Sequence, residues 1–105
     1  MPNSTLQDSI NELLALYGIG RFADMERRAK TLQKSFPGTP VLYELHGLAL
    51  TAQHRYSDAL ALLQRAVRGN PDDAQFWENL ALCQIQLKEH AAAEHSLRRA
   101  LALAD

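Results

Sequence analysis

The feature that most constrains the fold is an internal repeat with a period of 34 residues. Chemically similar residues return at this interval along the whole chain. The coincidences are Leu14, Leu48 and Leu82; Met25, Ala59 and Ala93; Ala29, Leu63 and Leu97; Leu32, Ala66 and Ala100; Phe22 and Tyr56; and Pro37 and Pro71. Such self-similarity is the signature of repeat architectures, in which each unit packs against its neighbours. We therefore expect one domain over residues 1–105, built from units at about 6–39, 40–73 and 74–105.

Each unit is expected to contain two helices. Apolar residues recur at spacings of three and four, as in Leu60, Leu63 and Val67, which is the periodicity of a helix and not of a strand. Pro37 and Pro71 should end the second helix of their units, because proline lacks the backbone N–H and disfavours helical geometry in the preceding residue. The sequence predicts helices at about 5–18, 22–35, 40–53, 56–68, 74–87 and 90–103, the first opened by a capping box of Ser4 and Gln7.

Composition sets the class of protein and its partners. The chain has 105 residues, 47% of them hydrophobic, which suits a single globular domain. Its formal net charge of -1 provides no positive field for nucleic acid or an anionic membrane surface. Residues 1–20 do not resemble a secretion signal, and no apolar run approaches the ~20 residues that cross a bilayer. With Cys83 as the single cysteine, we expect a soluble protein of the cytoplasm.

The residues give no sign of catalysis. His90 and His95 are five apart, whereas two metal ligands on one helical face need a spacing of three or four. Cys83 lies among apolar residues and should behave as a small apolar side chain. The basic residues of the second helices should form a solvated outer face. No glycine-rich phosphate loop, serine elbow or paired-acid motif is present. We expect no enzyme activity, no metal and no cofactor.

The units resemble the tetratricopeptide repeat (TPR), a helix-turn-helix unit of the same length. The second unit matches best, through Tyr43, Gly47, Tyr56, Ala59, Ala66 and Pro71. The third follows with Trp77, Leu80, Ala81, Ala93, Leu97 and Ala100. The first departs most, with Ser9 where an aromatic residue and Leu13 where a small residue are usual. A generic likeness to the N-terminal repeats of bacterial glycosyltransferase or sulfotransferase TPR proteins lies in Tyr17 to Phe22 and in Phe36 with Pro37.

The resemblance implies three hairpins stacked in a right-handed superhelix, with the first helix of each hairpin lining a concave groove that binds peptides. Residue by residue, the groove positions are Gln7, Ile10, Asn11, Leu14, Tyr17, Val41, Glu44, Leu45, Leu48, Thr51, Gln75, Glu78, Asn79, Leu82 and Ile85. Family members that grip the acidic tails of chaperones carry basic and asparagine side chains at five of these sites. Ile10, Leu14, Leu45, Gln75 and Asn79 stand there instead, so we do not expect this mode.

Two interpretations of the groove follow. Asn11 and Asn79 fit the asparagine ladder of O-linked N-acetylglucosamine transferases, although Leu45 interrupts it. The leucine stripe of Leu14, Leu48 and Leu82 instead favours a protein partner that lays an amphipathic helix or an extended apolar segment in the groove. The alternative is that these leucines pack between neighbouring first helices.

Three functions remain open at this point. The first is a protein–protein interaction scaffold that binds a peptide, the second is the targeting arm of a larger enzyme, and the third is a self-assembly module. TPR arrays usually finish with a polar helix that covers the last hairpin, and none follows here. The uncovered residues include Leu97 and Leu101, so we expect either a fragment of a longer protein or a homodimer through this hairpin.

Overall fold

The computed structural model describes residues 5–104, and within them it contains six helices and no strand. The helices are α1 (Leu6–Gly18), α2 (Phe22–Ser35), α3 (Pro40–Ala52), α4 (Tyr56–Gly69), α5 (Ala74–Gln86) and α6 (His90–Ala104). Every observed boundary lies within one residue of the expected one. The predicted all-α fold of helical hairpins is therefore confirmed.

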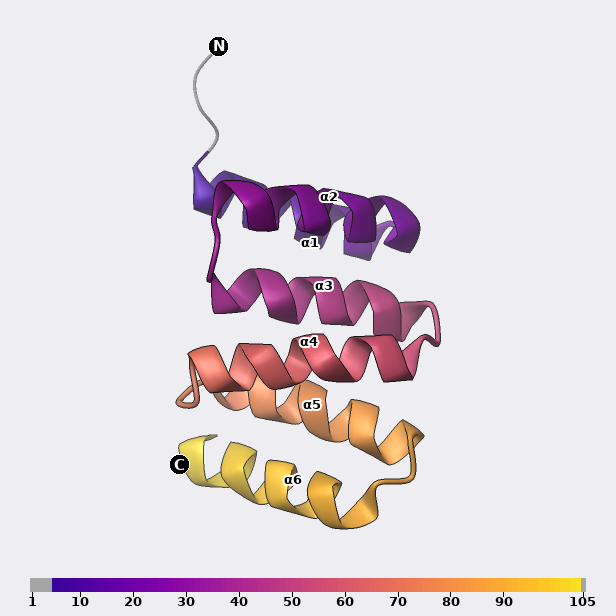
Figure 1. Cartoon of the computed structure of the whole chain (residues 1–105), viewed down its shortest axis with the longest axis vertical. Coiled ribbons are helices and arrows are strands. Elements are labelled where there is room, and N and C mark those ends of the chain that lie inside the picture. Colours follow the sequence, from indigo (N-terminus) through magenta and orange to yellow (C-terminus); the bar gives the residue numbers. More distant parts are fainter. Residues whose placement is uncertain (1–4, 105) are drawn as a thin grey trace.

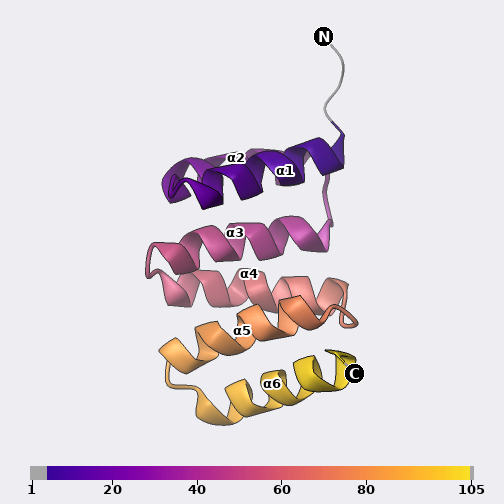
Figure 2. The ribbon, with the colours of Figure 1, turned by 180° about the vertical axis from the view of Figure 1, so that it is seen from behind.

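The hairpins are stacked along one axis. The molecule measures 48 × 27 × 21 Å, and α1 and α6 lie toward opposite ends of its long dimension (Figure 1). Each helix packs against the next in the chain, and α1 also contacts α3, as α3 contacts α5. In Figure 1 α2 lies in front of α1, and in Figure 2, from behind, α1 lies in front of α2. The first helices of successive hairpins therefore pack side by side, as a TPR superhelix requires.

The turn inside each hairpin passes through a left-handed residue. Gly20, His54 and Lys88 have φ values of 77°, 61° and 61°, and they are separated by the repeat period. Glycine adopts this conformation without steric cost, whereas histidine and lysine each pay roughly 1 kcal/mol or more for it. The repeat thus fixes backbone geometry at this position even where the sequence does not supply a glycine.

The helix starts correct one prediction. Thr5, not Ser4, caps α1: its hydroxyl accepts from the backbone N–H of Asp8 at 3.0 Å, and its own N–H donates to the Asp8 carboxylate at 3.2 Å. Ser4 lies outside the described residues, and the Gln7 amide donates to Asn11 Oδ1 at 3.0 Å. The Asp73 carboxylate accepts from the first N–H groups of α5, as its position before the helix predicts.

The core consists of two buried clusters. One gathers Leu13, Met25, Ala29, Leu32, Leu42, Leu45 and Ala49 from the first two hairpins. The other gathers Leu50, Ala59, Leu63, Ala66, Val67, Phe76, Leu80 and Cys83 from the second and third. Val41 packs against both clusters, so the apolar interior continues from one hairpin to the next.

Small residues let the helices approach closely, as the sequence indicated. A Cβ atom added to Gly47 on α3 would lie 2.7 Å from Cδ2 of Leu63 on α4, closer than carbon atoms pack. Ala59, Ala81 and Ala93 are likewise buried. Leu97, which we expected to fill space between units, is 38% exposed because α6 packs against α5 alone within the described residues.

Candidate binding surface on the first helices

The fifteen predicted groove residues all lie on α1, α3 and α5, and we call their common side the first-helix face. Eight are exposed: Gln7, Asn11, Leu14, Tyr17, Gln75, Glu78, Leu82 and Ile85. Four are half-buried: Ile10, Val41, Leu48 and Thr51. Three are buried: Glu44, Leu45 and Asn79. The two outer helices therefore offer open side chains, and α3 between them presents a more closely packed surface.

The apolar part of the face is open on α1 and α5. Leu14 and Leu82 are 47% and 52% exposed, and Tyr17 and Ile85 accompany them on the same helices. Exposed leucines at matching places of two repeats, each next to a second large apolar residue, leave apolar surface that a partner could cover. Leu48 differs, because it packs against the core cluster of the first two hairpins. The three leucines of the stripe therefore differ. Leu48 packs partly between helices, whereas Leu14 and Leu82 face solvent.

Leu45 and Asn79 do not present free side chains. Leu45 is 2% exposed and belongs to the core cluster of the first two hairpins. The Asn79 amide is engaged at both ends: its oxygen accepts from Gln75 Nε2 at 3.1 Å, and its nitrogen donates to Glu44 Oε2 at 2.7 Å. A peptide backbone that used an asparagine ladder here would have to displace one of these partners.

Glu44 is the most unusual charged group on the first-helix face. The residue is 7% exposed, and the hydrogen bond from Asn79 joins α3 to α5. Burial and the nearby negative charge of Asp73 raise the pKa of Glu44 to about 7, against the lowering effect of the Asn79 bond. Glu44 was predicted as a groove residue, but its burial and its bond with Asn79 were not. The available signal was the repeat itself, since Asn79 lies 35 residues after Glu44, one place beyond the equivalent position.

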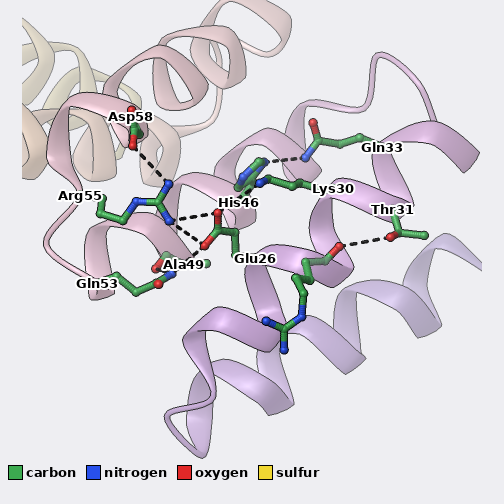
Figure 3. A network of polar contacts seen from close by, with 10 residues as sticks. Glu26, Lys30, Thr31, Gln33, His46, Ala49, Gln53, Arg55 and Asp58 are labelled. Carbon is green, nitrogen blue, oxygen red and sulfur yellow. Dashed lines mark hydrogen bonds and ion pairs between the residues drawn. The ribbon is translucent and has the colours of Figure 1, made fainter.

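A second polar cluster lies away from this face and joins the first two hairpins. Figure 3 shows Arg55 reaching from the turn before α4 toward Glu26 on α2, with Nη1 at 2.9 Å from Oε1 and 3.1 Å from Oε2. Gln53 Nε2 donates to Glu26 Oε1 at 3.1 Å, and Lys30 Nζ lies 3.4 Å from Glu26 Oε2. Burial alone would raise the pKa of Glu26, but these bonds and the Arg55 charge outweigh it and lower the pKa. Lys30 pairs with Glu26 within α2, and its side chain stays 58% exposed.

His46 belongs to the same junction. Gln33 Nε2 donates to His46 Nδ1 at 2.9 Å, which leaves the ring proton of the neutral imidazole on Nε2 (Figure 3). Burial lowers the pKa of His46, helped by the charges of Lys30 and Arg55 and opposed by that of Glu26. A buried neutral histidine with a satisfied nitrogen has a structural role in this setting.

The groups with possible reactivity are held in inert surroundings. Cys83 is fully buried, its thiol donates to the Tyr56 carbonyl at 3.2 Å, and burial, with the charge of Glu89, raises its pKa to about 11. Within residues 5–104, no three histidine, cysteine or acidic side chains are grouped as metal ligands would be. None of the described helices combines the length and apolar character needed to cross a membrane.

The stack of helical hairpins, in which α1, α3 and α5 pack in succession, defines a helical repeat protein. A family model described as "Tetratricopeptide repeat" matches residues 44–105, more than half of the chain. The chain therefore belongs to the tetratricopeptide repeat family.

Three similar proteins illustrate the likeness. An Hsp70-Hsp90 organizing protein of Triticum aestivum is 33% identical over 89 residues, which are 85% of this chain but 15% of that protein. The TPR domain of Sgt2 from Aspergillus fumigatus superposes with a TM-score of 0.88 at 15% identity, covering 99% of this chain and 72% of that one. MamA from Desulfovibrio magneticus RS-1 gives 0.86 at 17% identity, covering 96% and 57%. The Sgt2 and MamA structures share their fold with this chain.

Proposed function

We propose that this chain binds a protein segment along its first-helix face, with the exposed apolar side chains of α1 and α5 as the main contacts. The observation that carries the proposal is the paired exposure of Leu14 with Tyr17 and of Leu82 with Ile85, at equivalent places of the first and third repeats. An amphipathic helix or an extended apolar segment could cover both pairs at once and would bury their surface. The role is that of an adaptor without catalysis.

We do not propose that this chain binds the acidic tail of a chaperone, although the name of the Triticum aestivum relative refers to chaperones. A clamp for an acidic chaperone tail needs cations, because a desolvated carboxylate must be paired. The corresponding positions here are Ile10, Leu14, Leu45, Gln75 and Asn79, and none carries a positive charge. An acidic tail would therefore find no counter-charge on this face.

Peptide binding to a surface variant tests the proposal. The probes are three fluorescein-labelled amphipathic helical peptides with one common leucine face and a polar face of lysine, glutamate or glutamine. Fluorescence anisotropy should show that Leu82→Glu weakens the best of them at least about tenfold, since burying an unpaired carboxylate costs more than 1 kcal/mol.

The matched control is Leu101→Glu, an equally drastic change at a leucine that is 69% exposed on α6. Both variants should keep the helical circular dichroism of the wild type, because neither leucine belongs to a core cluster. Equal loss of binding in the two variants, or unchanged binding in Leu82→Glu, would show that the first-helix face is not the binding surface.

Self-association is a second candidate. Leu97 and Leu101 leave an apolar strip on α6, which within residues 5–104 contacts only α5 among the helices. A second copy could cover this strip, because contiguous exposed apolar residues often mark an interface. Light scattering at increasing concentration tests this, and a constant monomer mass would reject the dimer. Neither outcome affects the first-helix face.

A further inference from the structure

Lysine and arginine are confined to the second helices and the turns before them, whereas acidic residues occur on both sets of helices. All 11 lysines and arginines lie on α2, α4, α6 or the turns that precede them, and α1, α3 and α5 contain none. The first helices carry four acidic residues: Asp8, Glu12, Glu44 and Glu78. Asp8 caps its own helix, and Glu12 pairs with Arg28 of α2 at 2.9 Å. Among the ion pairs of residues 5–104, none involves Glu44 or Glu78.

Glu44 is the buried carboxylate on this face, and among the described residues no cation pairs with it. It is more than nine-tenths buried, and its hydrogen bond in the described structure comes from a neutral amide, to Oε2 alone. A buried carboxylate loses its hydration and is normally compensated by a paired cation, as Arg55 and Lys30 compensate Glu26. Among residues 5–104 no such cation pairs with Glu44, and the negative charge of Asp73 acts on the same group.

We propose that the Glu44 carboxylate, at the junction of α3 and α5, is a subsite for a lysine or arginine side chain of the guest segment. The partner is then a basic amphipathic segment, whose apolar residues cover the exposed leucines while one cation reaches Glu44. This inference rests on the function proposed above. Charge complementarity supports it, because the first helices carry four acidic residues and no lysine or arginine, and a negative surface attracts basic segments and repels acidic ones. The raised pKa of Glu44 agrees with a buried carboxyl group that has no paired cation.

The three labelled peptides of common leucine face test the subsite. We expect the lysine peptide to bind the wild type at least about tenfold more tightly than the glutamate peptide, since charge-assisted hydrogen bonds are the strong ones. Glu44→Gln keeps the size of the side chain and an oxygen for Asn79. It should weaken the lysine peptide about tenfold and leave the glutamine peptide unchanged. Glu89→Gln is the control, because Glu89 is an exposed carboxylate in the turn between α5 and α6. It should leave the affinities of both peptides unchanged.

The outcomes separate the two proposals. If Leu82→Glu weakens the glutamine peptide but Glu44→Gln leaves the lysine peptide unchanged, the surface binds a segment and the cationic subsite is rejected. Tightest binding of the glutamate peptide would reject the subsite as well. If no peptide binds the wild type, both the surface and the subsite are rejected. Circular dichroism of Glu44→Gln ensures that a weakened affinity does not come from unfolding.

Discussion

At the scale of single residues, Glu44 and Glu26 show how one side-chain type acquires opposite properties from its neighbours. Both are buried glutamates, 7% and 8% exposed. Glu26 meets Arg55, Lys30 and Gln53, which lower its pKa despite burial. Glu44 meets one amide and the charge of Asp73, and its pKa rises to about 7. The first is a stable ionised anchor of the fold, and the second is a carboxyl group that ionises near neutral pH.

The raised pKa of Glu44 predicts a pH dependence of stability. Because the folded state holds this proton more tightly than the unfolded state, its contribution is complete below the unfolded pKa of 4.5 and is lost as pH rises through about 7. The free energy of unfolding of the wild type, relative to Glu44→Gln, should therefore fall by on the order of 3 kcal/mol between these pH values. Urea unfolding of both proteins across this range measures it, and parallel profiles would contradict the assignment.

At the scale of helices, the sequence was sufficient for the helix boundaries but not for the contacts between hairpins. Proline, turn residues and three-to-four spacing are local signals, so the ends of all six helices could be predicted to within one residue. The contact of Arg55 with Glu26 joins residues 29 apart, and no local pattern encodes it. The same limit applies to the candidate site: exposure of Leu14 and Leu82 could be expected, whereas burial of Leu45 and the bond from Asn79 to Glu44 depend on tertiary packing.

The junction of the first two hairpins should depend on Arg55. Arg55→Ala removes the main counter-charge of a buried carboxylate and should lower the free energy of unfolding by about 2 kcal/mol. Arg27→Ala is the control, because Arg27 pairs with Asp24 at an exposed site, and such pairs contribute about 0–1 kcal/mol. Urea unfolding of the two variants compares them directly. Equal stability of both would mean that the Glu26 cluster does not hold the hairpins together.

At the scale of the whole molecule, the three stacked hairpins distribute cations unevenly between their first and second helices. The second helices and their turns carry every lysine and arginine, and the first helices carry acidic and exposed apolar residues. Since the hairpins are stacked along one axis, the first helices of successive repeats lie next to each other (Figure 2). An extended surface thus arises from short-range contacts between neighbouring repeats.

The central claim, that this surface receives the partner, is tested most directly by chemical-shift mapping of the isotope-labelled chain titrated with the lysine-faced peptide. We expect the backbone amide resonances of α1, α3 and α5 to shift, with the largest changes around Leu14, Glu44 and Leu82. The amide resonances of α2 and α4 should keep their chemical shifts. Shifts concentrated on α2 and α4, or confined to α6 around Leu101, would contradict the account.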